Sequence, residues 1–262
     1  MAGLFRRARR GRGITLVLGG GGARGLAHAG VLAALHDHDI PVRGIVGTSI
    51  GAEIGGLFAG GLSAAAIEDL VRDFDWLRTV RLFWPSLDGG GLTSGHNIED
   101  FLRQQLGDAR FADTVLPLRA VATDMHSGQQ VVLSEGSLVD AIRASIALPG
   151  IIRPHRVGGR TLGDGGLVNP LPVDVAYAEL GGPVVAVAVH PGAVRQEETD
   201  RELFGDTAAD DEAPPLTETL RRAIQITQAQ IVDLRLAAHA PDTLLRPAVA
   251  DIGVLEFYEG EK

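Results

Sequence analysis

Two short apolar runs near the N-terminus each end in a glycine-containing turn that leads into a stretch with helical character. Ile14–Leu18 is apolar and rich in β-branched residues, and four glycines separate it from a helical stretch that reaches about His38. The second run, 42–46, ends at Gly47 and precedes a helix of small residues over Ile50–Ala59. Two successive strand–turn–helix units are typical of a parallel sheet covered by helices.

The rest of the chain continues this alternation. Amphipathic spacing predicts helices over 63–78, 97–106, 137–146 and Leu216–Ala238, and apolar runs predict strands over 118–122, Gln130–Leu133 and 184–189. The last run consists entirely of Val and Ala, which is typical of a strand buried on both faces. Turn-forming residues dominate 85–97 and predict a loop. Without an internal repeat or a linker between two cores, the pattern predicts one α/β domain over 14–262, preceded by a tail over 1–13.

Charge and composition narrow the possible chemistry. The 262 residues include no Cys, which excludes disulfides, thiolate metal ligands and a Cys nucleophile. The net charge of −9 argues against contact with membranes and nucleic acids, but its uneven distribution weakens this argument, and we expect no nucleic-acid partner. Much of it comes from an acidic stretch over 194–214, which we expect to be a loop. The basic tail is expected to be solvated, with contact to an anionic membrane surface as the alternative.

The chain carries no predicted targeting or membrane-spanning segment. The apolar run behind the basic tail has only five residues, whereas a secretory signal needs about 7–15. The longest uncharged stretch that could be a helix, 54–67, is too short to cross a bilayer. These features predict a cytoplasmic protein whose only membrane contact would be peripheral.

The first candidate for chemistry is Gly20-x-Gly22-x-x-Gly25, between the first strand and its helix. A dinucleotide-binding loop would need an acidic residue at the end of the second strand, where this chain has Gly47-Thr48-Ser49. Backbone N–H groups of such a turn, backed by a helix N-terminus, stabilise a negative oxygen. That oxygen could belong to a phosphate or to the oxyanion of a tetrahedral intermediate. Close helix–strand packing is the purely structural alternative.

The second candidate is Gly47-x-Ser49-x-Gly51, which lies between the second predicted strand and its helix. A Ser on so sharp a turn exposes its hydroxyl at the edge of the sheet, because the flanking glycines carry no side chains that would clash. The motif therefore predicts a nucleophilic Ser49, with capping of the following helix as the alternative role.

A nucleophilic Ser needs a base, and Asp164 is the preferred candidate. It stands among glycines in Leu162-Gly163-Asp164-Gly165-Gly166, where a carboxylate can approach another part of the backbone closely. An Asx turn is its structural alternative. His190 follows the run 184–189 and would complete a Ser–Asp–His order, although only one strand precedes the Ser49 turn, unlike an α/β-hydrolase. We expect His28 to pack or to hold a backbone group.

Together these motifs resemble the patatin-like phospholipase family, in its bacterial branch related to the catalytic domain of neuropathy target esterase. The likeness extends from about Ile14 to Phe257. The segments that carry it are Gly19-Gly20-Gly21-Gly22-Ala23-Arg24-Gly25-Leu26-Ala27-His28, Gly47-Thr48-Ser49-Ile50-Gly51-Ala52, Thr123-Asp124 with Gly128, Ala144-Ser145-Ile146-Ala147-Leu148-Pro149, Asp164-Gly165-Gly166-Leu167-Val168-Asn169 and Asp251-Ile252-Gly253.

The resemblance implies a three-layer fold with a mainly parallel central sheet and helices on both faces. It implies a Ser49–Asp164 dyad that acts without a His base, a metal or a cofactor, and an oxyanion hole made by backbone N–H groups around Gly20, Gly21 and Gly22. The implied substrate is a lipid or another acyl ester, cleaved through an acyl-enzyme. Arg24 is expected to be a solvated helix residue. The functional alternative is that it contacts a phosphate or a lipid headgroup. Supporting motif residues are Gly19, Arg24, Gly25, Gly47, Gly51, Gly165 and Gly166.

Two functional alternatives remain open beside this reading. One is an esterase with a Ser49–Asp164–His190 triad for small soluble esters, and the other is a protein that binds a phosphate or lipid without turnover.

The segment 76–92 holds both tryptophans. Core packing is its default role, and lining an acyl groove or resting at a membrane interface is the functional hypothesis.

Overall fold

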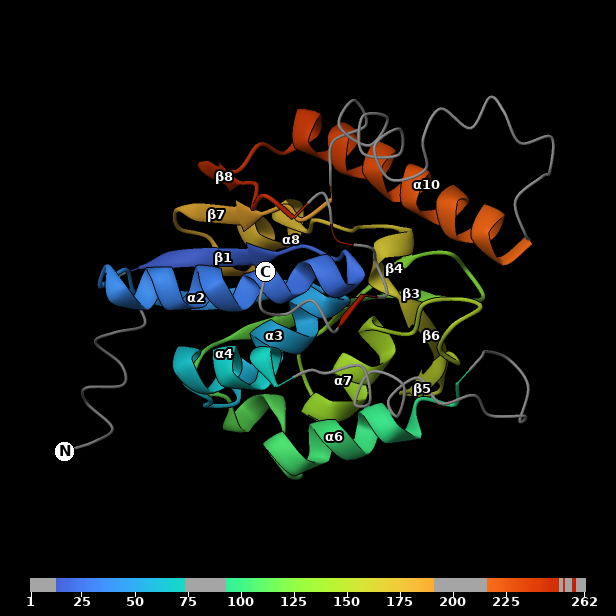
Figure 1. Ribbon diagram of the computed structural model, residues 1–262, viewed down its shortest axis with the longest axis horizontal. Coiled ribbons are helices and arrows are strands. Elements are labelled where there is room, and N and C mark those ends of the chain that lie inside the picture. The colour runs from blue at the N-terminus through green and yellow to red at the C-terminus, as the bar shows by residue number, and fades with distance from the viewer. Residues whose placement is uncertain (1–12, 74–92, 191–215, 250–251, 253–255, 258–262) are drawn as a thin grey trace.

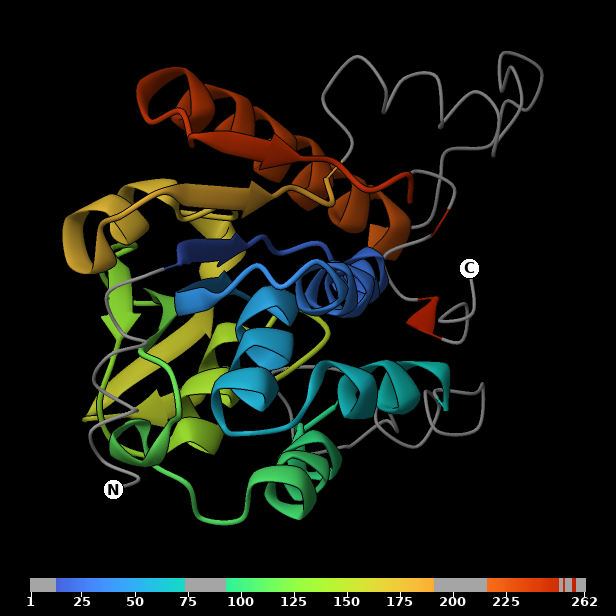
Figure 2. The ribbon, with the colours of Figure 1, turned by 90° about the vertical axis from the view of Figure 1, so that its left-hand side faces the viewer.

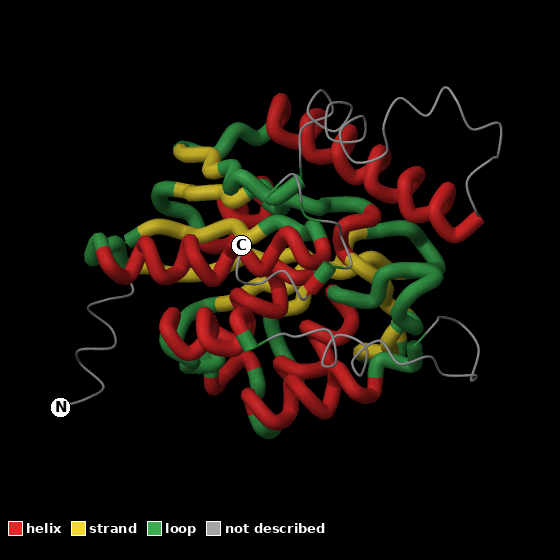
Figure 3. The backbone as a smooth tube through the Cα atoms, viewed as in Figure 1, coloured by secondary structure: helices red, strands yellow, loops and turns green. Residues whose placement is uncertain are grey.

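The protein is built around one mixed sheet of eight strands, seen between two groups of helices in Figures 1 and 3. This computed structural model describes residues 13–73, 93–190, 216–249, 252 and 256–257. The strand order is β5-β6-β3-β2-β1-β7-β8, and β4 also pairs with β3. The strands are β1 (Ile14–Leu18), β2 (Val42–Thr48), β3 (Leu118–Asp124), β4 (Gln130–Leu133), β5 (His155–Val157), β6 (Arg160–Asp164), β7 (Val184–Val187) and β8 (Thr243–Leu245).

Helices cover both faces of this sheet, so the expected three-layer α/β fold is confirmed (Figure 2). Alternation along β1 shows the two layers, because Leu16 and Leu18 join one apolar cluster while Val17 joins the other. The first cluster packs under α2 (Ala27–Asp37), α3 (Ile50–Ala59), α4 (Ala64–Arg72), α6 (His96–Leu106) and α7 (Leu138–Ser145). The second packs under α8 (Val173–Val175), the π turn Ala176–Leu180 and α10 (Leu216–Ala238).

Several element boundaries differ from the sequence expectations. The strand expected over 184–189 ends at Val187. Its partner β1 ends at Leu18, which lies opposite Val187, and the Gly19 N–H that follows donates to the Val187 carbonyl. The helix expected from residue 63 begins after Ser63, whose hydroxyl caps the Ala66 N–H. Strands β5, β6 and β8 were not anticipated. The hairpin of β5 and β6 turns through Gly158 and Gly159, both at positive φ.

The register of β3 explains how the fold brings two distant motifs together. Strand β4 pairs with β3 over residues 120–123, so β2 and β6 share the opposite side of β3. There β2 runs parallel to β3 and ends with Thr48 opposite Val121, while β6 runs antiparallel and ends with Asp164 opposite Ala122. The two strands therefore meet end to end, and Ser49 and Asp164 lie at their junction.

Four regions discussed above lie wholly or largely outside the described residues. They are the tail 1–13, the tryptophan-containing segment 76–92, the loop 85–97 and the acidic stretch 194–214. The helix expected over 63–78 is described only as far as residue 73. Among the helices that the structure describes, none is long and apolar enough to cross a membrane.

Candidate active site

Ser49 occupies a sharp turn between β2 and α3. Its backbone has φ 55° and ψ −127°, and it is one of two non-glycine residues with positive φ in the described chain. A side chain in this conformation is strained, and such strain persists where the surroundings hold it in place. The Ser49 N–H donates to the Ser145 hydroxyl at 2.9 Å, and that hydroxyl donates to the Val121 carbonyl at 2.6 Å. Ser145 thus fixes the turn from α7.

The glycines on either side of Ser49 are required because backbone packs against both. A Cβ on Gly47 would lie 2.4 Å from the Gly51 carbonyl oxygen. A Cβ on Gly51 would lie 2.1 Å from the Leu18 carbonyl oxygen. Neither contact involves a flexible side chain that could move away. The spacing of the motif therefore follows from the close approach of α3 to β1 and β2.

This crowding predicts a stability effect. We expect Gly51→Ala to lower the free energy of unfolding by about 3 kcal/mol, because the new methyl group overlaps the Leu18 carbonyl. The matched control is Gly30→Ala in α2, where an added Cβ meets nothing within 4 Å. That change should instead raise stability by about 0.5–1 kcal/mol. Urea unfolding of the three proteins checks both signs, and equal midpoints would contradict the packing argument.

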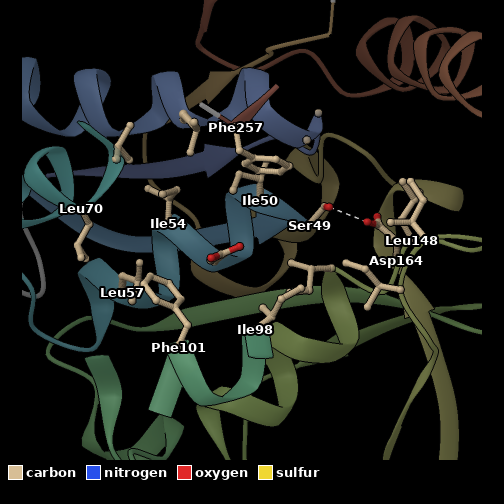
Figure 4. A pocket seen from close by; sticks show the side chains of 18 of the residues that line it. Ser49, Ile50, Ile54, Leu57, Leu70, Ile98, Phe101, Leu148, Asp164 and Phe257 are labelled. Atoms are coloured by element: carbon tan, nitrogen blue, oxygen red, sulfur yellow. Dashed lines mark hydrogen bonds between the residues drawn. The ribbon is translucent and has the colours of Figure 1, made fainter. Parts of the chain in front are cut away.

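Asp164 lies directly against the Ser49 hydroxyl. The Ser49 Oγ donates to Asp164 Oδ2 at 2.6 Å, drawn as the dashed line in Figure 4. That length is typical of a hydroxyl bonded to a carboxylate. The Asp164 side chain is 2% exposed, and burial raises its pKa to about 6, although the bonds from Ser49 and the Gly166 N–H oppose the shift. The carboxylate is thus a stronger base than one in water.

The backbone around Asp164 fixes the direction of its carboxylate. The Gly166 N–H donates to Asp164 Oδ1 at 2.7 Å, which leaves Oδ2 to Ser49. The Thr123 hydroxyl donates to the Asp164 carbonyl at 2.8 Å. A Cβ on Gly165 would lie 2.2 Å from the Val121 carbonyl oxygen, so the turn fits only with glycine there. Asp164 therefore forms the Asx turn with Gly166 through one carboxylate oxygen and contacts Ser49 through the other.

The glycine loop after β1 passes beside Ser49. A Cβ on Gly20 would lie 3.4 Å from the Ser49 Cβ, and Gly21 and Gly22 line the pocket next to Ser49. The Gly20 N–H already donates to the Pro170 carbonyl at 2.9 Å. The expectation that Gly20 supplies an oxyanion donor is therefore corrected, because its one N–H is taken. Gly21 and Gly22 remain the candidates.

His28 and Arg24 hold this loop in place. The His28 ring is fully buried, with Nε2 2.8 Å from the Gly19 carbonyl, so it holds a backbone group as expected. Burial lowers its pKa to about 4, which keeps the ring neutral. Arg24 is 6% exposed, and its Nε donates to the Ile252 carbonyl at 2.6 Å. The expectation of a solvated Arg24 is wrong, because the turn Gly22–Leu26 directs it inward.

His190 lines the same pocket but does not stand between the other two residues. Asp164 Oδ2 accepts directly from Ser49, and Oδ1 accepts from the Gly166 backbone. The His190 Nε2 is buried and has no hydrogen-bond partner in the part of the chain that is described. Burial, with the Arg24 charge adding to it, lowers the pKa of His190 to about 4. The triad arrangement expected as an alternative is therefore not formed.

An apolar pocket extends from the Ser49–Asp164 pair along α3. In Figure 4, Leu57, Leu70 and Phe101 lie on the side of the pocket away from Asp164. The lining consists mainly of aliphatic and phenylalanine side chains from α3, α4, α6 and the segment 146–152. Among the described residues, its polar side chains are those of Ser49, Glu53, Asp164, His190 and Gln228. The pocket suits a long hydrocarbon chain whose carbonyl carbon sits at Ser49.

Asn169 supports the site although the sequence alone indicates no role for it. Asn169 accepts from the Thr48 hydroxyl through its carbonyl at 2.8 Å, and its side-chain amide donates to Gln130 and Asp174. It thereby ties β2 to the turn after Asp164. Its place five residues after Asp164 was visible in the sequence, but its partners lie far away along the chain. The described residues hold no group of three or more His, Asp or Glu side chains arranged to bind a metal ion.

Sequence comparison finds relatives of this chain among the NTE family proteins. An uncharacterised NTE family protein of Mycobacterium tuberculosis is 33% identical over 271 residues, which cover 97% of this chain and 45% of the relative. The lysophospholipase NTE1 of Yarrowia lipolytica is 31% identical over 268 residues, covering 94% of this chain and 18% of the relative. The chain thus spans less than half the length of these curated relatives.

A solved structure shares the fold. VipD from Legionella pneumophila superposes with a TM-score of 0.53 at 12% identity, over 95% of this chain and 73% of that one. The family model described as patatin-like phospholipase matches residues 16–177, a range that contains Ser49, Asp164 and the glycine loop. The chain belongs to the patatin-like phospholipase family.

Proposed function

We propose that this protein is a serine-dependent hydrolase of lipid acyl esters, of the phospholipase A, lysophospholipase or carboxylesterase type. The observation that carries the proposal is the 2.6 Å contact between Ser49 Oγ and Asp164 Oδ2 at one end of an apolar pocket. Family membership and the lysophospholipase name of the Yarrowia relative support a lipid ester as substrate.

The proposed reaction proceeds through an acyl-enzyme. Ser49 Oγ attacks the ester carbonyl carbon while its proton passes to Asp164 Oδ2. The N–H groups of Gly21 and Gly22 stabilise the oxyanion of the tetrahedral intermediate. When that intermediate collapses, the leaving alcohol takes the proton from Asp164. Water then attacks the acyl-enzyme, gives its proton to Asp164, and the second collapse releases the fatty acid as Ser49 recovers the proton.

A carboxylate is a weak base for a Ser hydroxyl, and the surroundings of Asp164 reduce this mismatch. Burial raises its pKa to about 6, close to the pH at which a cytoplasmic enzyme works. The apolar lining favours substrates whose chains displace water from the pocket, and in such a dry site the oxyanion donors act more strongly. A long acyl chain therefore fits both the shape and the chemistry.

The proposal is tested by covalent labelling and by substrate length. A fluorophosphonate probe should label the folded protein at Ser49, and Ser49→Ala should abolish labelling because the attacking oxygen is gone. Turnover of p-nitrophenyl esters should rise with acyl length as more of the pocket is filled, by about tenfold for each two methylenes at most. A folded protein that does not label would favour the alternative of binding without turnover.

A further inference from the structure

Glu53 is a carboxyl group set into the apolar wall of the pocket. It lies one helical turn after Ser49 on α3, where its N–H donates to the Ser49 carbonyl at 3.1 Å. The pocket-lining residues around it on the same helix are Ile50, Ile54 and Leu57. Residues three and four apart on a helix lie on the same face, so Glu53 shares the pocket-facing side of α3 with Ile50 and Leu57. Because Glu53 lines the pocket within one turn of Ser49, an acyl chain that is bound at Ser49 and runs along α3 passes Glu53 within its first few carbons.

The other polar groups of the pocket belong to its reactive end. Ser49 and Asp164 bond to each other, and a Cβ on Gly166 would meet both the Gln228 amide and Asp164 Oδ1. Glu53 takes no part in that cluster. Within the described residues its carboxyl group has no hydrogen-bond or ion-pair partner. The site therefore holds a carboxyl with unused hydrogen-bonding capacity, and burial raises the pKa of this group to about 7.

An unsubstituted acyl chain would complete the desolvation of this carboxyl without offering it a partner, and an unsatisfied buried polar group is costly. A chain with a hydroxyl at this depth would supply one hydrogen bond at that point. An ammonium group could also pair with Glu53, but burying two charges among Ile and Leu side chains carries a desolvation penalty that a hydroxyl avoids. The neutral donor therefore fits these surroundings best.

We propose that Glu53 is a specificity-determining residue, whose carboxyl group accepts a hydrogen bond from a hydroxyl on the first few carbons of the acyl chain. The preferred substrates are then hydroxyacyl esters. This inference rests on the proposed hydrolase function, since it concerns the acyl chain that Ser49 attacks.

The test compares two p-nitrophenyl esters of equal chain length, octanoyl and 3-hydroxyoctanoyl. Further hydroxyoctanoyl esters then carry the hydroxyl on carbons closer to the methyl end. Wild-type protein should prefer one of the hydroxy esters by about tenfold in kcat/KM. Glu53→Leu should bring that ratio to about one and raise turnover of the plain ester. Glu53→Gln, which still accepts a hydrogen bond, should retain part of the preference. The matched control is Glu68→Leu, a carboxyl on α4 that pairs with Arg72 and is absent from the pocket lining.

The outcomes separate the two proposals. If wild-type protein and Ser49→Ala hydrolyse the esters equally, the hydrolase function itself fails. If Ser49→Ala is inactive but Glu53→Leu keeps the wild-type ratio at every hydroxyl position, only the role of Glu53 is overturned. Thermal unfolding of each variant identifies a loss of fold, and the ratio of two substrates on one protein is independent of its folded fraction.

Discussion

Asp164→Asn is expected to lower kcat for ester hydrolysis by about 10⁴-fold, close to the loss caused by Ser49→Ala. The amide cannot accept a proton from Ser49 Oγ, yet it is nearly the same size as the carboxyl. Its oxygen can still accept from the Gly166 N–H, which now bonds to Asp164 Oδ1 at 2.7 Å. The geometry of the turn should therefore survive while the base is lost. Single-turnover kinetics on a p-nitrophenyl ester measures the effect on acylation directly.

His190→Ala distinguishes the direct dyad from a triad. His190 lines the pocket, but no hydrogen bond in the described structure joins it to Asp164 or Ser49. We expect its removal to reduce kcat far less than Asp164→Asn does. Abolition of turnover by His190→Ala, with much activity left in Asp164→Asn, would show that the dyad is the wrong mechanism.

The same Asp164→Asn protein should be more stable than wild type at neutral pH. A carboxyl whose pKa is raised to about 6 by folding adds stability below its unfolded pKa and loses it as pH rises through 6. At pH 8 the ionised group then costs the fold about 3 kcal/mol, from roughly two pKa units. The Asn side chain carries no such cost. The difference in free energy of unfolding between Asp164→Asn and wild-type protein, measured in urea, should therefore shrink toward pH 4. A variant that is inactive and also less stable at pH 8 would instead indicate a damaged turn.

The residues that could be predicted from sequence are those whose role is local. The sharp turn at Ser49 needs only a strand, a helix and two glycines within five residues, so the motif itself predicts the turn. Asp164 could be named as the candidate base from its glycine surroundings and the family resemblance. Its distance from Ser49 could not be predicted, because it depends on β2 and β6 meeting end to end along β3. The three-residue strand β5 and strand β6 leave little periodicity to detect.

Other features escaped prediction because they depend on contacts far apart in the chain. The loss of Gly20 as an oxyanion donor follows from its bond to Pro170, about 150 positions later. The burial of Arg24 could not be predicted either, because its Nε donates to the carbonyl of Ile252, which lies 228 positions later. Glu53 carried a signal that could have been used, because it is the one charged residue in the otherwise apolar helix Ile50–Ala59. A charge in the first turn of the helix that follows the candidate nucleophile lies close to the proposed site.

The pH dependence of hydrolysis should report Asp164 directly. Because the base must be ionised, kcat/KM is expected to fall tenfold per pH unit below about 6, reaching about a hundredfold loss at pH 4. Glu53 lines the same pocket with a pKa near 7 and could add a second transition. In Glu53→Gln that transition disappears, while the limb near pH 6 should remain.

The pH at which this limb begins separates Asp164 from the two buried histidines. Burial lowers the pKa of His28 and His190 to about 4, so both rings stay neutral across the limb and charge only below it. A histidine base would therefore keep the rate constant down to about pH 4, whereas the Asp164 base loses it from pH 6. A rate measured between pH 4.5 and 8 in Glu53→Gln, with circular dichroism at each pH to confirm the fold, decides between them. A flat profile over that range contradicts the role of Asp164, because a buried carboxyl that must be ionised cannot act as base once it is protonated.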